Sequence, residues 1–343
     1  MKYYTEEGYL NMEEIISDPN PFIFIVCSRG SGKTFGALKY VHDHDQHFIL
    51  MRRTQTQADM VQSDELNPFK SLYTELGEDY LYKFKKVAKS ITGIYREADG
   101  QLERKGLLLA LSTISNIRGF DASDVDILIY DEFIGEKHER PIKHEGIAFL
   151  NAIETIGRNR ELKGKPALKV ICMANSNDLA NPLFIQLGLV RYAEKMIRKD
   201  IEKISLPERS LSLYILNHSP ISQKKAETAL YRLSGKSEFT DMAISNSFSL
   251  EFTEMVRSLS LKEYRPLVAV GEIVIYQHKS DLRYYVTDHL SGKPEVYGSS
   301  EIDIQRFSNN YYHLKLSYLN RHIYFESYVL QVLFEKYFKL CYI

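Results

Sequence analysis

The feature that most constrains the fold is a short apolar run followed at once by a glycine-rich loop and a helical pattern. The run is Phe22–Val26, the loop is CSRGSGKT at 27–34, and the helical pattern begins at Phe35. In this order, the backbone N–H groups of the loop and the N-terminus of the helix face a phosphate group. The sequence therefore predicts an α/β domain that binds a nucleotide.

The loop residues have distinct expected roles. Lys33 is expected to reach the β- and γ-phosphates, and the Thr34 hydroxyl is expected to ligate Mg²⁺. Cys27 stands where the consensus has its first glycine, a position that mainly turns the chain out of the strand. The predicted nucleotide contacts in the loop are Ser28, Arg29, Gly30, Ser31, Gly32, Lys33 and Thr34.

A second apolar run, Ile127–Tyr130, ends in two adjacent acids, Asp131 and Glu132. In a parallel sheet this end lies at the carboxyl edge beside the loop. Asp131 is expected to hold Mg²⁺ through its water shell, and Glu132 to act as the base that activates water. Two acids at a strand end can also cap a helix, but the upstream loop favours ATP hydrolysis with ATP and Mg²⁺ as ligands. The acid pair is typical of ATPases that do mechanical work.

The distribution of apolar runs predicts the domain organisation. Further strands are expected at 48–51, 107–111 and 168–173, with a helix carrying Phe149, Ile153 and Ile156 before the last of them. We predict a mainly parallel, ASCE-type P-loop ATPase domain over residues 1–200 and a helical connector over 201–250. A small α+β domain is expected over 251–343, with hairpin strands at 266–276 and 284–287 and a terminal helix at 324–340.

Composition limits the kinds of partner. Lys and Arg number 44 against 45 Asp and Glu, which gives a formal net charge of −1. A protein that coats DNA by bulk charge is distinctly basic, so any DNA contact here must be local. The three cysteines are widely spaced, and no run approaches the roughly 18 apolar residues of a membrane span. These features predict a protein of the cell interior without a disulfide framework, a zinc knuckle or a membrane segment.

Several polar positions keep more than one explanation. Arg158 and Arg160 close a predicted helix, where arginine can reach a neighbouring subunit's site or merely offset the helix dipole. Asn175 follows the fifth strand, where it can sense the γ-phosphate or simply form a turn. Arg52 and Arg53 could contact nucleotide, a neighbour, DNA or solvent.

Other charged clusters carry weaker predictions. The candidates for DNA contact are Lys83, Lys85, Lys86, Lys89 and Arg118, although a lysine-rich hairpin is also common at a soluble sheet edge. The histidines at 42, 44 and 47 are interpreted as a solvated helix end rather than a metal site. Asp288 has no convincingly placed acid nearby in sequence, and a two-metal nuclease needs several, so nuclease activity is not expected.

Several segments in order resemble one family. They are CSRGSGKT, FILMRR, DVDILIYDEFIGEK, ETIGRNRE and VICMANSNDLANP, which together span roughly residues 20 to 190. With these motifs the chain resembles the DNA-packaging ATPases, or encapsidation proteins, of phi29-like small tailed phages. At Cys27 the chain departs from the family's usual glycine, a difference that concerns the shape of the loop more than its chemistry.

The resemblance implies more than the residues do. It implies a ring, thought to be pentameric, that pumps duplex DNA through the capsid portal, in the host cytoplasm and transiently at the procapsid. Arg158 matches a trans-acting arginine finger, and Lys137 matches a lysine that reaches across the interface. The C-terminal domain would be RNase H-like and inactive as a nuclease. Some members use a packaging RNA, which nothing in this sequence indicates. The alternatives are a complete terminase with nuclease activity and a nucleotide-switched assembly or export protein.

Overall fold

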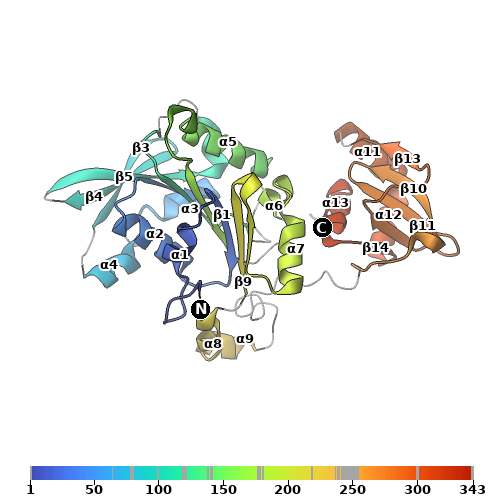
Figure 1. The fold of residues 1–343 in the computed structure, drawn as a ribbon, viewed down its shortest axis with the longest axis horizontal. Coiled ribbons are helices and arrows are strands. Elements are labelled where there is room, and N and C mark those ends of the chain that lie inside the picture. The colour runs from blue at the N-terminus through green and yellow to red at the C-terminus, as the bar shows by residue number, and fades with distance from the viewer. Residues whose placement is uncertain are drawn as a thin grey trace. The chain divides into compact units, whose positions relative to one another are not determined.

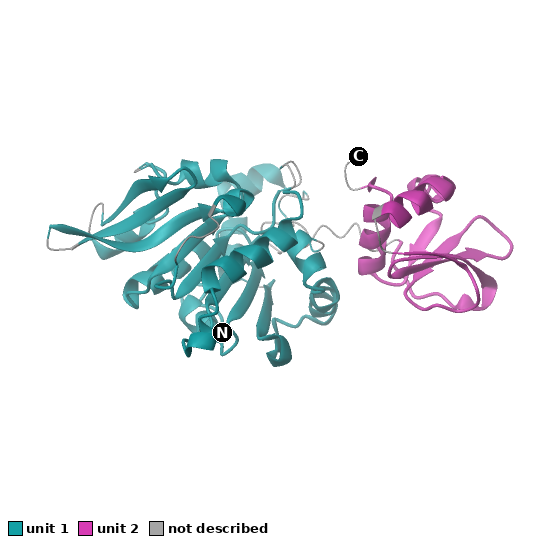
Figure 2. Cartoon of the chain, turned by 90° about the horizontal axis from the view of Figure 1, so that it is seen from above, with its two compact units in different colours: residues 1–248 teal, residues 249–343 magenta. Residues whose placement is uncertain are grey.

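In a computed structural model the chain forms two compact units, residues 1–248 and 249–343 (Figure 2). The structure describes residues 2–63, 65–77, 81–98, 100–117, 122–136, 139, 142–175, 179, 181–217, 219–235, 237, 240, 255–298 and 301–340.

Unit 1 is built on a nine-stranded sheet with the order β3-β4-β5-β2-β6-β7-β1-β9-β8 (Figure 1). The strands from β5 to β9 in this order run parallel, whereas β3, β4 and β8 join as antiparallel edge strands. The bounds are β1 Phe22–Cys27, β2 Phe48–Arg52, β3 Tyr82–Ala88, β4 Ile91–Ala98, β5 Gln101–Ala110, β6 Ile127–Asp131, β7 Lys169–Ala174, β8 Lys203–Leu206 and β9 Leu211–Leu216. The five strands predicted for this domain and its mainly parallel sheet are confirmed.

Helices cover both faces of this sheet, which explains why its central strands are apolar throughout. Along β1, Ile23 and Ile25 pack into the core that includes α1 and α2, whereas Phe24 makes edge-to-face contacts with Phe149 of α5 and Phe184 of α6. The helices are α1 Met12–Ile16, α2 Lys33–Asp43, α3 Gln55–Met60, α4 Lys70–Leu76, α5 Glu145–Gly157, α6 Pro182–Gln186, α7 Val190–Lys199, α8 Pro220–Ala226 and α9 Ala229–Ser234, with 3-10 turns η1 Leu111–Ile117, η2 Glu161–Lys163 and η3 Pro207–Arg209.

The predicted helical connector over 201–250 is wrong in its first part. Residues 203–216 form β8 and β9, and β9 pairs in parallel with the loop-bearing strand β1. The run Leu211–Leu216 is buried at every position, which is the pattern of a strand in the interior of a sheet. Helices α8 and α9 follow, so the helical prediction holds from residue 220 to 234.

Unit 2 contains a five-stranded sheet with the order β13-β10-β11-β12-β14. Its elements are η4 Leu261–Glu263, β10 Tyr264–Val270, β11 Ile273–His278, β12 Tyr284–Thr287, β13 Glu295–Tyr297, α11 Glu301–Asn310, α12 Tyr312–Leu319, β14 Ile323–Phe325 and α13 Tyr328–Tyr337. The hairpin strands are confirmed. The terminal helix begins later than predicted, because Tyr324 belongs to β14, which pairs in parallel with β12. The RNase H-like character of this unit stays a prediction.

A candidate nucleotide site at the carboxyl edge of the sheet

The glycine-rich loop connects β1 to the N-terminus of α2. Gly30 and Gly32 have φ of +69° and +83°, which is backbone that glycine adopts without strain. Cys27 is the last, buried residue of β1, and its Sγ lies 3.1 Å from Ser31 Oγ. Ser31 Oγ in turn donates to the Ser28 carbonyl at 3.0 Å. The unusual cysteine is thus held by a hydrogen bond inside the loop.

Lys33 lies under this loop rather than in solvent. Its side chain is buried, and its Nζ donates to the Ser28 carbonyl at 3.0 Å and to Asn175 Oδ1 at 2.8 Å. Asn175 directly follows β7, the parallel neighbour of β1, so two adjacent strand ends bring the pair together. This contact favours the site interpretation of Asn175 over a simple turn.

Strand β6, which ends in Asp131, reaches the same carboxyl edge of the sheet. Thr34 Oγ1 donates to Asp131 Oδ2 at 2.8 Å, and Asp131 is 1% exposed. Within the described residues, the other carboxylate oxygen, Oδ1, is buried without a hydrogen-bond partner. An orphaned carboxylate oxygen beside a hydroxyl is an oxygen donor set that fits Mg²⁺, which prefers such ligands.

Glu132 leaves the strand in an unusual backbone conformation. Its φ of +59° is rare for a residue with a side chain and turns the carboxylate away from the strand direction. Arg52 Nη1, from the end of β2, lies 3.2 Å from both Asp131 Oδ2 and Glu132 Oε2. Partial desolvation of this half-exposed side chain and the neighbouring Asp131 charge raise the pKa of Glu132, which suits a carboxylate that accepts a proton.

Arg53, directly after β2, connects the end of this strand to the start of α5. It forms a bidentate pair with Glu145, through Nε–Oε1 at 2.7 Å and Nη2–Oε2 at 2.9 Å, and its Nη1 lies 2.9 Å from Glu139 Oε2. Glu145 is 2% exposed and starts α5. The sequence left Arg52 and Arg53 unassigned because a twin arginine at a strand end has no spacing signature. In the structure, Arg52 faces the acids and Arg53 joins β2 to α5.

Arg158 caps α5 at the opposite edge of the sheet. It is exposed, with φ of +37°, and the following Arg160 donates to the carbonyl of Val125, just before β6 begins. The distance from the start of α5 to its end is roughly 20 Å at 1.5 Å per residue. Arg158 therefore lies at the amino edge and cannot reach its own subunit's Asp131. Arg160 is held inside the subunit, and Lys137 and Arg118 lie outside the described residues.

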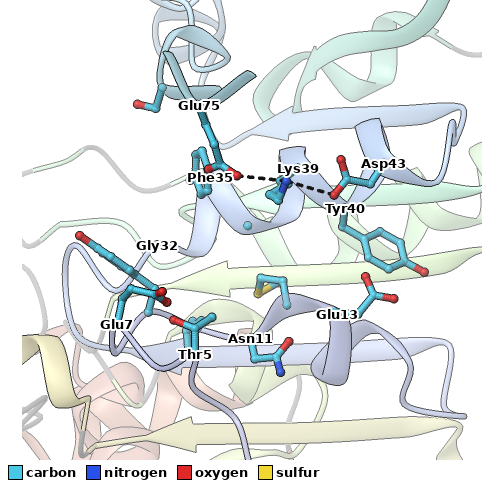
Figure 3. Close-up of a pocket in the computed structure, with 15 residues that line it drawn as sticks. Thr5, Glu7, Asn11, Glu13, Gly32, Phe35, Lys39, Tyr40, Asp43 and Glu75 are labelled. Carbon is cyan, nitrogen blue, oxygen red and sulfur yellow. Dashed lines mark ion pairs between the residues drawn. The ribbon is translucent and has the colours of Figure 1, made fainter. Parts of the chain in front are cut away.

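A groove of about 760 Å³ runs along α2 from Gly32, between the N-terminal segment and α4 (Figure 3). It is bounded by the tyrosines at positions 9 and 40, and Lys39 crosses it in ion pairs with Asp43 and Glu75 at 3.3 and 3.1 Å. The carboxylates of Glu7 and Glu13 lie on its N-terminal side, so the negative charge of the groove disfavours a phosphate group. The groove suits an uncharged ring system beside the loop.

The lysine-rich strand is β3, and its end leads into the start of β4. This turn lies at the same carboxyl edge, because Thr92 at the start of β4 pairs with Leu108 near the end of β5. Lys83 is paired with Glu97, and Lys85 lies 5.8 Å from the ring centroid of Tyr95. Lys86 and Lys89 are exposed around the turn from β3 to β4. Of the four lysines predicted to contact DNA, these two present the freest charges.

Two groups of residues were not expected to bind a metal, and the structure arranges them differently. The three histidines at 42, 44 and 47 make separate contacts, with Tyr82, Glu13 and Asp124 respectively. The expectation that no other acid is placed near Asp288 is wrong. The pairing of β12 with β14 brings Glu326 beside it, and with His289 their ligand atoms lie within 4.8 Å of one another. This cluster is largely exposed, and such groups are common without an ion.

Helix α8 also contacts the loop, which the sequence did not indicate. Ser222 Oγ lies 3.1 Å from Ser28 Oγ, with both residues buried, and Lys225 Nζ donates to the Arg29 carbonyl. Arg29 itself extends away, with Nη1 3.9 Å from Glu136 Oε1. Because β9 pairs with β1, helix α8, which follows β9, lies beside the loop. The contact could have been predicted only by recognising β9 as a strand.

A mainly parallel sheet with a glycine-rich loop, a buried lysine and two strand-end acids at its carboxyl edge defines an α/β protein with P-loop architecture. Comparison with known proteins then gives the family. Residues 5–269 match the podovirus DNA encapsidation protein (Gp16) family, and the chain belongs to this family.

Relatives and solved structures agree with this assignment. The DNA packaging protein of Bacillus phage phi29 is 26% identical over 349 residues, covering 96% of this chain and 95% of the relative. That of Bacillus phage B103 is 24% identical over 335 residues, covering 92% and 96%. The fold is similar to that of the bacteriophage Phi-29 viral genome packaging motor assembly, at a TM-score of 0.69 and 19% identity, with 97% and 99% of the two chains covered. The Phi-28 gp11 DNA packaging motor gives 0.62 and 18%, with 98% of each chain covered.

Proposed function

We propose that this chain is an ATPase that forms a ring at the portal of a viral procapsid and drives duplex DNA inward. The observation that carries the ATPase activity is the convergence of Lys33, Thr34, Asp131 and Glu132 at one sheet edge. Membership of the encapsidation family supports DNA as the load. No helix in the described part of the chain is long and apolar enough to cross a membrane.

The residues divide the hydrolysis between them. The backbone of the loop and Lys33 hold the phosphates, and Thr34 and Asp131 are placed to hold Mg²⁺, which would neutralise charge on the phosphate oxygens. Glu132 takes the proton from the attacking water. Before nucleotide arrives, Arg52 Nη1 lies 3.2 Å from a carboxylate oxygen of each acid and offsets their negative charge.

The position of Arg158 supports the proposed ring. An exposed arginine in a tight αL turn at the amino edge cannot complete its own site, but it can enter the site of a neighbour. An arginine supplied in this way stabilises the negative charge that develops in phosphoryl transfer. We propose this role for Arg158, with five subunits on the strength of the family resemblance. A packaging RNA is not indicated.

The lysine turn is proposed as a local DNA contact. We expect the double substitution Lys86→Gln with Lys89→Gln to leave basal ATP hydrolysis unchanged and to reduce its stimulation by duplex DNA several-fold. Because each phosphate contact contributes about 0.9 to the slope of log affinity against log salt, the slope for DNA binding should fall by about 2. The measurement is ATPase rate and DNA affinity between 50 and 200 mM salt.

The matched control is the double substitution Lys195→Gln with Lys199→Gln, which removes two exposed charges from α7. This variant should keep the wild-type DNA stimulation and salt slope. If both double variants lose stimulation equally, net charge and not the turn governs DNA contact. If wild-type hydrolysis is absent with and without DNA, the proposed function itself is wrong.

A further inference from the structure

Helix α8 brings a third cation to the glycine-rich loop. The Nζ atom of Lys225 donates to the carbonyl of Arg29 and lies beside Gly30, the residue that follows. A Cβ atom added to Gly30 would lie 2.2 Å from Lys225 Nζ and 3.0 Å from its Cε. The ammonium group therefore occupies the space beside the glycine, at the outer surface of the loop, that a side chain at Gly30 would fill.

The contact is electrostatically unfavourable without an anion. The charged groups that act most on the Lys225 ammonium are Lys33 and Arg29, and both carry the same sign. Burial and these two cations lower the pKa of Lys225, whereas its hydrogen-bond acceptor is a neutral carbonyl. Like charges held together at partly buried positions cost free energy that a multiply charged anion between them would reverse.

The position of α8 is fixed by other contacts, so Lys225 is not a loose surface side chain. Ser222, one turn earlier, is buried with its Oγ 3.1 Å from Ser28 Oγ. At the start of the helix, Ser219 Oγ donates to the Gly8 carbonyl at 3.3 Å. A Cβ atom on Gly8 would lie 2.9 Å from the backbone nitrogen of Ile221, which shows how closely the N-terminal loop approaches.

We propose that Lys225 is a further phosphate ligand, which binds the polyphosphate of the nucleotide from α8 while Lys33 binds it from beneath the loop. On nucleotide binding, Nζ exchanges the Arg29 carbonyl for a phosphate oxygen. Helix α8 thereby responds to whether the loop is filled. This inference rests on the proposed nucleotide-binding function of the loop and adds a residue that the loop motif does not contain.

The test compares the binding of a non-hydrolysable ATP analogue, AMP-PNP, with that of AMP, by calorimetry on the full chain with Mg²⁺. We expect Lys225→Met to weaken AMP-PNP binding about tenfold, because a hydrogen bond between charged groups is lost. Binding of AMP should change much less, and Lys225→Arg should retain most of the AMP-PNP affinity. The neighbouring Lys224→Met, which loses a hydrogen bond to the Glu7 carbonyl instead of one to the loop, should behave as wild type.

The possible outcomes separate this inference from the proposed function. If Lys33→Ala abolishes AMP-PNP binding while Lys225→Met leaves it unchanged, the loop binds nucleotide and the role of Lys225 is wrong. Equal losses for AMP-PNP and AMP would mean that Lys225 only shapes the loop, which also overturns the inference. If wild type does not bind AMP-PNP, the proposed function fails with it. Should Lys225→Met not fold, the AMP-PNP-to-AMP affinity ratio of Lys225→Gln decides in the same way.

Discussion

Replacing Glu132 by glutamine is expected to reduce ATP hydrolysis by about 10²- to 10⁴-fold, the usual contribution of a general base. Glutamine keeps the shape of the side chain but cannot take a proton from water. The left-handed backbone at Glu132 does not depend on the charge, and the glutamine oxygen can still accept the hydrogen bond from Arg52, so the fold and nucleotide binding should remain. Steady-state hydrolysis and nucleotide binding are measured on the same preparation.

The control for this variant is Glu154→Gln, which makes the same chemical change on the exposed face of α5. Its hydrolysis rate should match wild type. Retention of more than a tenth of the wild-type rate by Glu132→Gln would assign the base to another residue.

The second large effect concerns stability. Arg53→Met is expected to lower the free energy of unfolding by about 3–5 kcal/mol, because removing one partner of a buried ion pair leaves the other charge uncompensated. The partner, Glu145, is 2% exposed and bonded twice by Arg53. By contrast, Arg104→Met breaks an exposed pair with Asp124 and should cost less than about 1 kcal/mol. Urea unfolding followed by circular dichroism measures both.

The deficit of Arg53→Met should also depend on pH in a defined direction. Burial already raises the pKa of Glu145 above its ordinary value of 4.5, and Arg53 opposes this shift. Without Arg53, the folded-state pKa rises further, so stability is retained below the unfolded pKa and lost as pH rises through the folded one. The difference from wild type should therefore be larger at pH 8 than at pH 5. A deficit that is equal at both values would contradict the assigned pair.

The sequence predicted best where a local pattern fixes the three-dimensional position. The loop at 27–34 and the acids at 131 and 132 each follow an apolar run, and parallel pairing necessarily brings such strand ends to one edge. The residues that join these parts were not predictable in the same way. Arg52, Arg53 and Lys225 act through partners far away in sequence, and no spacing within the chain reports those contacts.

The errors have a similar origin. Leu211–Leu216 is a fully buried strand. The Ser, Pro and basic residues around it led to its prediction as part of a connector. Short apolar runs do not distinguish a strand from a helix without tertiary context. The same limit explains Tyr324, which reads as the start of a helix and lies in β14 because β12 offers it a parallel partner.

The measurement that tests the central claim most directly is ATP hydrolysis by mixtures of two inactive variants, Arg158→Ala and Glu132→Gln, with duplex DNA present. Arg158 lies at the amino edge and Glu132 at the carboxyl edge, so in the proposed ring a complete site combines Glu132 of one subunit with Arg158 of its neighbour. Mixing should therefore restore part of the wild-type rate, cooperatively with protein concentration. If Arg158→Ala alone is near wild type, or if the mixture stays inactive while each variant still assembles, the account of a site shared between subunits is wrong.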